Sequence, residues 1–405
     1  MNCRCCGSEN VETVLDLGLQ PLSNDYIAKD KLNNAQFFIP LRVGVCKDCW
    51  LAQVMNYEMP EKIFNEEYKY FSSFSSTWLE HCKNYVDMIV KRLNLNAESK
   101  VLEVASNDGY LLQYFKNYGI EPLGVDPSKA TAEVAMLKGI NTIVEFWGEK
   151  FANKLGRKFD LILGNNVLAH VPDIKDFVRG LKTGLAEHGT ITIEFPHLMP
   201  LIENCYFDTI YHEHFSYLSL TAVNNLFNNC GLKLYDVEEQ TTHGGSLRIY
   251  ATHTENNSIG IKDTIALFLE KEHRFGIDSI DKYREFSDRV KNIKYDVLEH
   301  LISYKRAGKS IVGYGAAAKG NTFFNYIGIK NEFIDYVVDA SPYKQGSYLP
   351  GSQIPIFNIE KIKETKPDVI IIIPWNIKPE IVKLLSFVHN WGGVLITLMP
   401  KIEVL

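Results

Sequence analysis

Long apolar runs are missing from this chain of 405 residues. No stretch reaches the roughly 18 apolar residues of a membrane-spanning helix, and Met1 leads directly into polar residues and cysteines instead of a signal peptide. The net charge of −6 lacks the positive excess that would favour nucleic acid or an anionic membrane. Isolated cysteines (Cys82, Cys205, Cys230) suit a reducing compartment better than a disulfide framework. We expect a cytoplasmic protein with no nucleic-acid or membrane partner; its oligomeric state stays open, a monomer included.

Short repeats, low-complexity tracts and one well-known fingerprint are also missing. The turn after the first predicted strand of the chain's middle region lacks G-x-G-x-x-G, which argues against a nicotinamide-type dehydrogenase there. In contrast, the 46% hydrophobic and 12% aromatic content is enough to build full cores. The length suggests two or three domains at roughly 100–200 residues each.

Two cysteine pairs are the first positive signal. Cys3 and Cys6 form one C-x-x-C pair, Cys46 and Cys49 the other, and four thiolates can close a tetrahedral zinc site. The 39 residues between the pairs exceed the roughly 15–20 of common zinc ribbons. Residues 37–45 are typical of a strand running into the second pair. Cys5 is expected to be a spectator that could replace a neighbour, and four reduced thiols are the alternative. We predict a structural zinc module over residues 1–66.

Strand and helix patterns alternate through residues 67–255. Apolar strands are expected at 101–105, 122–126, 142–144, 159–164 and 190–195, with helices between them, the first at 110–118. The alternation predicts a parallel sheet covered on both faces. Strands at 233–237 and 247–251 have no long helix between them, so we expect an antiparallel hairpin at the sheet edge.

A second alternating block occupies residues 256–405. It opens with a charged, amphipathic helical connector over 256–308. Short β-branched runs at 310–315, 334–339, 369–373 and 393–398 then predict a smaller parallel sheet. Two nucleotide-type sheets in one α/β chain are therefore expected.

Polar residues follow the strands of the first sheet, at the edge where open α/β sheets bind ligands. Asp126 ends the second strand and can accept hydrogen bonds from two ribose hydroxyls, although it can equally cap the next helix. The segments that follow these strands, taken in order, resemble those of the class I S-adenosylmethionine-dependent methyltransferases, with Ala105 where that family often has glycine. The cofactor-binding candidates are Glu103, Ala105, Asn107, Gly109, Asp126, Pro127, Asn165 and Asn166.

The densest chemical segment is Tyr-His-Glu-His-Phe-Ser-Tyr at 211–217. Its two histidines could bind a metal, but they lack the i, i+4 spacing of helical zinc-protease motifs. A histidine base with an orienting carboxylate is the favoured interpretation, and a surface histidine-rich loop without a function is the alternative. His170 follows the fourth strand and either points into the same site or is a structural histidine.

Several motifs, taken in order, resemble the nucleotide-sugar C-methyltransferases, in particular the C-3′-methyltransferases of deoxysugar pathways. They are the two C-x-x-C pairs and the segments at 68–73, 106–109, 165–172, 211–217 and 243–248. The resemblance implies S-adenosylmethionine as cofactor, structural zinc, and a nucleoside-diphosphate 4-keto-deoxysugar as substrate. It implies that His214 removes a proton beside the ketone while Tyr211, Glu213 and His170 stabilise the enolate oxygen. Tyr68 would close over the sugar, or be ordinary aromatic packing.

The small-residue turn at 313–322 suggests an anion site, because such a turn presents backbone N–H groups and a helix N-terminus. By the same resemblance, the C-terminal domain holds the nucleotide of the substrate. A degenerate Rossmann-like block kept for stability is the alternative. The substrate-binding candidates are Gly313, Gly315, Lys319, Asp339, Lys344, Trp375 and Asn376.

The expected fold is thus an α/β chain with a zinc-binding module, a class I methyltransferase core and a second Rossmann-like domain. Other functions remain open at this stage: O- or N-methylation of a nucleotide sugar, RNA methylation guided by a zinc ribbon, or a nucleotide-binding scaffold without activity.

Overall fold

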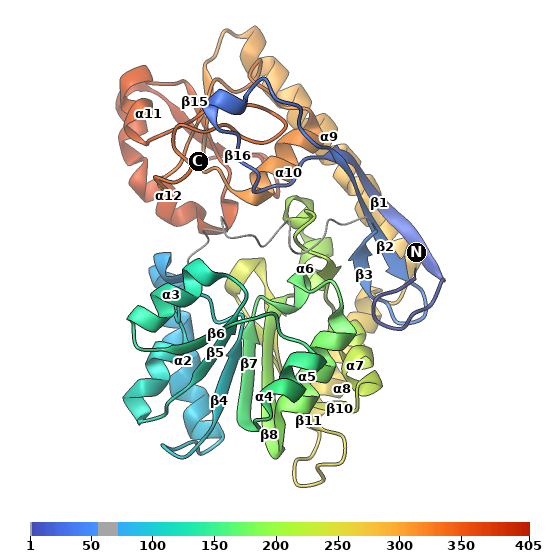
Figure 1. Ribbon diagram of the computed structural model, residues 1–405. Helices are drawn as coiled ribbons and strands as arrows, with labels where there is room; N and C mark the ends of the chain where they lie inside the picture. Colours follow the sequence, from blue (N-terminus) through green and yellow to red (C-terminus); the bar gives the residue numbers. More distant parts are fainter. Residues whose placement is uncertain (1, 56–71) are drawn as a thin grey trace.

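The computed structural model describes residues 2–55 and 72–405. Figure 1 shows two sheet-bearing bodies, one above the other, with the N-terminal strands and the long helix α9 (Ile280–Arg306) along one side. No helix within these described ranges is both long and apolar enough to cross a membrane. Tyr68, a predicted site residue, lies outside the described residues.

The lower body is built on a seven-stranded sheet of order β10-β11-β8-β7-β4-β5-β6. Its parallel strands are β4 (Val101–Val104), β5 (Leu123–Asp126), β6 (Asn141–Val144), β7 (Phe159–Asn165) and β8 (Leu185–Pro196). The edge beside β8 carries an antiparallel hairpin, β10 (Leu232–Gln240) and β11 (Ser246–His253). The predicted parallel sheet and edge hairpin are both confirmed.

Helices cover both faces of this sheet because alternate side chains of each strand point to opposite sides. On one face, α2 (Ser76–Arg92) and α3 (Lys129–Leu137) share a core with Val101 and Leu161. On the other, Leu102 and Ile162 pack with α4 (Glu149–Leu155), α5 (Ile174–Gly184), α7 (Leu220–Asn229) and α8 (Asp263–Phe275). Helix α6 (Leu198–Glu203) lies between the two bodies in Figure 1.

The helix predicted at 110–118 takes a different form. It is a 3₁₀ segment, η3 (Leu112–Tyr118), between two left-handed glycines, Gly109 (φ 73°) and Gly119 (φ 71°). Left-handed backbone interrupts an α-helix, so the chain has room for only two short turns. Leu112 and Phe115 are nevertheless fully buried on the α2 face, as a helix there requires.

The upper body holds a six-stranded sheet of order β14-β13-β12-β15-β16-β17, parallel except for the last strand. The strands are β12 (Ile311–Tyr314), β13 (Val337–Val338), β14 (Ile356–Phe357), β15 (Val369–Ile372), β16 (Val394–Thr397) and β17 (Glu403–Val404). Its helices are α10 (Ala318–Ile327), α11 (Glu360–Thr365) and α12 (Lys378–Leu384). The second predicted α/β domain is therefore present.

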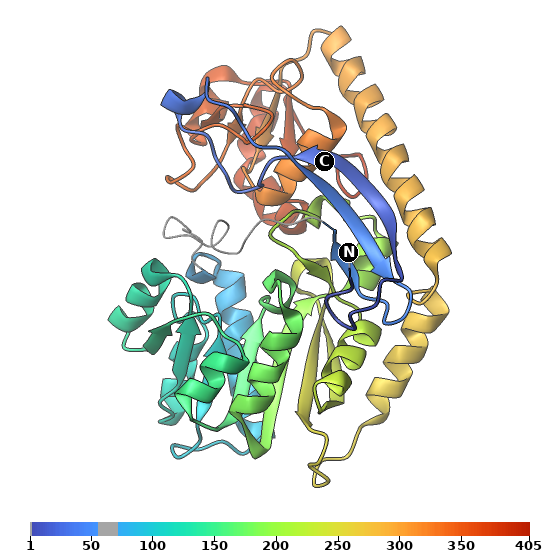
Figure 2. The same cartoon turned by 45° about the vertical axis from the view of Figure 1, so that its right-hand side comes forward.

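The N-terminal module is an antiparallel sheet of β1 (Val11–Gln20), β2 (Ile39–Cys46), β3 (Ala52–Val54) and β9 (Ser216–Tyr217). The predicted strand before the second cysteine pair is β2. Figure 2 shows β1 and β2 running along α9. One hydrophobic core joins them to the upper body, with Leu17 and Val43 from the module, Leu301 from α9 and Ile311 from β12.

Candidate active site

The four predicted zinc ligands converge. The sulfur atoms of Cys3, Cys6, Cys46 and Cys49 all lie within 4.8 Å of one another, with Cys3–Cys49 and Cys6–Cys46 at 3.5 Å. Tetrahedral zinc with Zn–S bonds of about 2.3 Å needs sulfurs about 3.8 Å apart, so the cluster fits the ion with small adjustments. Cys5 is buried but does not belong to this cluster, as the spectator interpretation expected.

The loop after β4 has unusual backbone angles. Ala105 (φ 59°), Asn107 (φ 48°) and Gly109 (φ 73°) are left-handed, as is Asn166 (φ 55°) at the end of β7. Non-glycine residues held at positive φ concentrate at ligand sites, where surrounding structure maintains the strain. Glu103 is fully buried just before this loop, and burial raises the pKa of its carboxyl well above the ordinary value.

Asp126 ties this loop to the end of β5. One oxygen, Oδ2, accepts the Asn107 N–H (2.9 Å), while Oδ1 accepts the Ser128 N–H (2.9 Å) and the Thr131 hydroxyl (2.8 Å). Ser128, not Asp126, is the N-cap of α3. Pro127 separates the two residues at the same edge. Oδ1 already accepts two hydrogen bonds, but Oδ2 accepts only one, so the geometry leaves room for a ribose hydroxyl on Oδ2.

Polar atoms without partners mark this edge. Within the described parts of the chain, buried atoms that lack a hydrogen bond include Ser106 Oγ, Asp108 Oδ1, Asn165 Nδ2 and Asn166 Oδ1. Buried polar groups are normally paired, so unpaired ones gathered at the carboxyl ends of strands point to a ligand that supplies the partners. A hydroxyl, a carboxylate oxygen, an amide nitrogen of Asn165 and an amide oxygen of Asn166 can pair with the hydroxyl, amine and carboxylate groups of S-adenosylmethionine.

His214 is held in one tautomer. Its Nδ1–H donates to the Thr209 carbonyl (2.8 Å), which leaves Nε2 as the acceptor facing the Tyr211 hydroxyl, also at 2.8 Å. Burial lowers the pKa of His214 well below its usual value, and the nearby His170, His243 and Lys319 add to this. At neutral pH the imidazole therefore carries a lone pair on Nε2.

The other predicted catalytic residues that the structure describes lie next to His214. The His170 ring lies 4.6 Å from the His214 ring, and its Nδ1–H donates to the Glu213 carbonyl (2.8 Å). Burial lowers the pKa of His170 to about 4 and raises the pKa of the Glu213 carboxyl. Glu213 Oε1 accepts a hydrogen bond from Asn24 (3.1 Å), whereas Oε2 is buried without a partner among the described residues. A protonated Glu213 can thus donate a hydrogen bond from Oε2.

The predicted substrate residues of the upper body fall into two groups. The first surrounds Ala316, whose N–H donates to Asp339 (2.7 Å) and whose carbonyl accepts from Lys344 (2.7 Å). Gly315 is left-handed (φ 97°), and a Cβ there would meet the Pro374 ring at 2.5 Å. Gly313 lies in β12 behind this turn, where a Cβ would meet Val337 at 2.7 Å.

The second group reaches the segment before His214. Lys319 Nζ donates to Asn376 (2.5 Å) and lies 4.5 Å from the centre of the Trp375 ring. Trp375 stacks on Tyr206 (4.2 Å, 21°) and donates from Nε1 to Asp208 (2.7 Å). These side chains therefore stand beside the turn that orients His214.

The segment 243–248 was noted as a motif, but two sets of contacts near the site were not predicted from the sequence. His243, left-handed at φ 55°, hydrogen-bonds Asn166 (3.1 Å). Below it, the fully buried Glu194 accepts from His81 (2.9 Å) and Arg248 (2.6 Å). The two glycines after His243 were a usable turn signal. His81 is a lone histidine on a long helix, and no local pattern distinguishes it.

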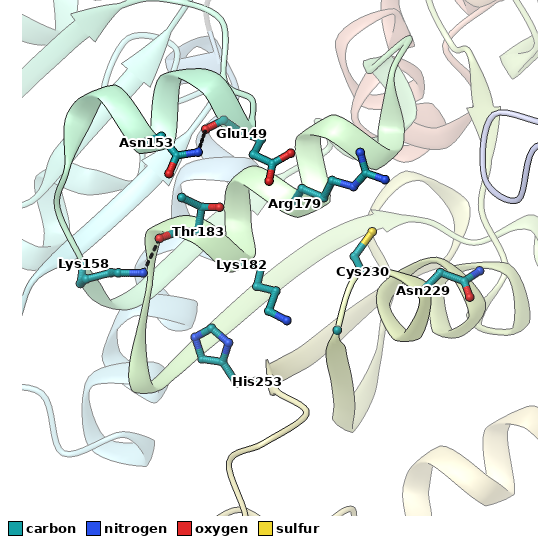
Figure 3. Close-up of a pocket in the computed structure, with 10 residues that line it drawn as sticks. Glu149, Asn153, Lys158, Arg179, Lys182, Thr183, Asn229, Cys230 and His253 are labelled. Atoms are coloured by element: carbon teal, nitrogen blue, oxygen red, sulfur yellow. Dashed lines mark hydrogen bonds between the residues drawn. The ribbon is translucent and has the colours of Figure 1, made fainter.

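A separate pocket lies at the other end of the strands (Figure 3), lined by Lys158, Arg179, Lys182 and His253 among others. Lys158 donates to the Thr183 carbonyl (2.6 Å) in the last turn of α5. Cations at a helix C-terminus are favoured by the helix dipole, which accounts for Lys158 and Lys182 at the end of α5. No predicted site residue of the described ranges contributes to it.

Three family models match consecutive parts of the chain. They are described as "Putative zinc binding domain" (residues 3–64), "Methyltransferase domain" (78–237) and "C-methyltransferase C-terminal domain" (241–400). Among solved structures, a S-adenosylmethionine-dependent methyltransferase from Clostridium acetobutylicum is 12% identical with a TM-score of 0.36, over 43% of this chain and 92% of that one. Magnesium protoporphyrin IX methyltransferase from Synechocystis, with bound S-adenosylmethionine, is 15% identical with a TM-score of 0.34, over 44% and 81%.

The fold, the strand-end site and the cysteine cluster define a S-adenosylmethionine-dependent methyltransferase with a structural zinc module. C-methyltransferase NovU from Streptomyces niveus is 33% identical over 408 residues, which span 100% of this chain and 96% of that protein. The chain belongs to the same family of C-methyltransferases.

Proposed function

We propose that the chain methylates a carbon next to the C-4′ ketone of a nucleoside-diphosphate deoxysugar, C-3′ being the expected position. Bound S-adenosylmethionine supplies an electrophilic methyl group. The site residues prepare the carbon that accepts it, by removing a proton and holding the resulting enolate.

The observation that carries this proposal is the orientation and protonation state of the His214 ring. A base must be unprotonated and aimed, and the Thr209 carbonyl fixes the ring so that Nε2 holds the lone pair. The lowered pKa keeps that lone pair free at neutral pH. In the proposed step, Nε2 takes the proton from the sugar carbon and the electron pair moves onto the ketone oxygen.

Donors beside His214 would stabilise that oxygen. The Tyr211 hydroxyl can turn about its C–O bond from Nε2 to the enolate, and Glu213 can donate from Oε2 when protonated. One such donor typically stabilises the transition state by about 3–4 kcal/mol. His170 supports them through its bond to the Glu213 carbonyl.

We assign residues 1–66 to the zinc module, 67–255 to S-adenosylmethionine, and 256–405 to the nucleotide of the substrate. The Ala316 turn with Asp339 and Lys344 would hold the nucleotide, because it combines a small-residue turn, a carboxylate and a cation. Lys319, Trp375 and Asn376 would line the path from that turn to His214.

The test incubates the enzyme with dTDP-4-keto-6-deoxyglucose and other 4-keto-6-deoxy nucleotide sugars in D₂O without cofactor. Enolate formation puts deuterium on a carbon beside the ketone, and NMR shows whether it is C-3′ or C-5′. Adding S-adenosylmethionine should then place the methyl group on that carbon. O- or N-methylation without carbon labelling would contradict the proposal.

His214→Asn is the matched variant, since asparagine keeps a donor for Thr209 but has no base. Proton transfer by a placed side chain contributes roughly 10²–10⁴-fold, so exchange and methylation should both fall by that factor. A variant that exchanges at the wild-type rate would remove His214 from the mechanism.

A further inference from the structure

The turn that carries two zinc ligands also touches the loop of residues 209–215 that holds His214, here called the catalytic loop. Arg4 follows the ligand Cys3, and its guanidinium donates from Nη1 to the Phe215 carbonyl and from Nη2 to the Val54 carbonyl, both at 2.5 Å. Phe215 is the residue directly after His214. The guanidinium also lies 5.7 Å from the centre of the Phe215 ring.

The same carbonyl is held from a second side. The Val54 N–H donates to it (3.0 Å), and β3 pairs with β9 in antiparallel register, with Ala52 opposite Tyr217 and Gln53 opposite Ser216. The Arg4 backbone N–H donates to Gln53 Oε1 (3.1 Å). Phe215, Val54 and Gln53 are fully buried, so this junction is shielded from water.

These contacts connect the zinc site to the catalytic loop through the Arg4 side chain. Zinc fixes the backbone of the Cys3–Cys6 turn, and that backbone sets where the Arg4 side chain begins. The planar guanidinium presents its donors in a fixed fork, so it can hold two carbonyls at a set separation. The catalytic loop ends at one of those carbonyls.

Building on the proposed role of His214, we propose that Arg4 is a positioning residue for the methyl transfer. Through the Phe215 carbonyl, it fixes the backbone from which the His214 ring reaches the substrate. The zinc module then contributes to the rate as well as to folding, although no zinc ligand contacts the site. A misplacement of a catalytic group by about 1 Å can lower the rate roughly 10²-fold. Loss of the Arg4 hydrogen bonds to this loop should therefore lower kcat.

The experiment compares Arg4→Met with Arg4→Lys and with Arg42→Met. Arg42 is in the same module and forms an ion pair with Asp16 (2.9 Å), both about half exposed. Its replacement controls for the loss of an arginine there. Each protein is analysed for zinc per chain, for S-adenosylmethionine affinity, and for kcat and KM of deuterium exchange into dTDP-4-keto-6-deoxyglucose.

We expect Arg4→Met to keep its zinc and its cofactor affinity while kcat falls by roughly tenfold to a hundredfold with KM nearly unchanged. Arg4→Lys, which keeps the charge but cannot span both carbonyls, should fall in between, and Arg42→Met should match the wild type. A wild-type kcat in Arg4→Met, or a loss that disappears when rates are expressed per zinc-loaded chain, would overturn the proposal. If Arg4→Met does not fold, Arg4→Lys decides by the same criteria.

A readout without substrate separates this proposal from the function it rests on. The imidazole Cε1–H signal of His214, assigned by its loss in His214→Asn, should shift in zinc-loaded Arg4→Met and stay in place in Arg42→Met. An unmoved signal refutes the positioning role even if no sugar reacts. Exchange that survives in His214→Asn refutes the proposed function instead.

Discussion

At the scale of single residues, the protonation state of His214 makes a prediction about pH. Its folded pKa is well below the usual 6.5, chiefly because it is buried, and His170 beside it has a pKa of about 4. In the proposed mechanism the neutral ring is the base, so a lowered pKa extends activity toward acid and the rate falls only as pH drops through the folded value. A profile of kcat/KM for deuterium exchange should therefore stay flat from pH 8 to about 6.5 and fall only in more acidic buffer. An acid limb above pH 7 would contradict the burial argument.

Two aspartates, one in each sheet, share a geometry. Asp126 accepts the backbone N–H groups of Asn107 and Ser128, both at 2.9 Å. Asp339 accepts those of Ala316 (2.7 Å) and Ser341 (2.8 Å). In both, an acid at the end of the second strand ties down the loop after the first, so each body has the same ligand-side construction.

This shared geometry predicts that replacing each aspartate weakens the binding of one ligand and leaves the other ligand's affinity unchanged. Asp126→Asn should weaken S-adenosylmethionine about tenfold or more and leave dTDP affinity near wild type, because the lost acceptor serves only the lower body. Asp339→Asn should do the reverse. Calorimetric titration of each variant with each ligand checks the prediction, and a variant that weakens both ligands equally would show general damage instead of site loss.

At the scale of elements, Glu272 of α8 holds the N-terminus of α7, the helix that follows the His214 segment, by hydrogen bonds. The carboxylate is fully buried and accepts from His197 (2.7 Å), the Leu220 N–H (2.6 Å) and the Thr221 hydroxyl (2.6 Å), so it satisfies the N-terminus of α7. Burial alone would raise the pKa of Glu272, but these hydrogen bonds outweigh it and lower the pKa below the ordinary value.

Glu272→Ala should therefore lower the free energy of unfolding by about 3–5 kcal/mol, since it leaves buried donors unpaired. A carboxyl with a depressed folded pKa contributes stability above the unfolded value of about 4.3 and loses it as pH falls through the folded one. Urea unfolding at pH 7 and pH 3.5 should show the gap between variant and wild type narrowing in acid. Glu270→Ala removes a surface pair with Arg274 on the same helix and should cost under about 1 kcal/mol.

The elements also show how far the sequence could predict the fold. Strands such as β4, β7 and β15 are short apolar runs, and the cysteine spacing identifies its own ligands, so local pattern was sufficient for them. Strand β9 is two residues long and joins a sheet whose other strands lie more than 160 residues earlier. No periodicity marks such a pairing. For the same reason, Arg4 carried no signal as a partner of Phe215.

At the scale of the whole molecule, all three parts of the chain meet at the loop of His214. The N-terminal segment contributes Asn24 to Glu213, and the zinc turn holds the carbonyl after His214. The upper body contributes Trp375, which contacts Tyr206 and Asp208 just before the loop. Sequence motifs provided candidate residues for this site, but only the packing of distant segments shows that the loop is anchored at both ends.

The contact between the upper body and that loop predicts a kinetic effect. Trp375→Phe keeps an aromatic ring on Tyr206 but removes the Nε1–H that donates to Asp208. Asp208 is buried, which raises its pKa, and the Lys319 charge and the indole N–H oppose that rise. A hydrogen bond to a charged group is worth about 1.5–3 kcal/mol, so its loss should loosen the turn whose Thr209 carbonyl orients His214.

We expect kcat to fall about tenfold in Trp375→Phe while S-adenosylmethionine affinity stays unchanged, because the cofactor residues belong to the lower body. Trp391→Phe is the matched control. Its Nε1–H donates to the Pro367 carbonyl (3.0 Å) inside the upper body, so its loss should lower stability and leave kcat intact. Steady-state kinetics and calorimetry on the two variants distinguish these outcomes. If both variants lowered kcat equally, the upper body would act through its overall stability and not through the contact with Asp208.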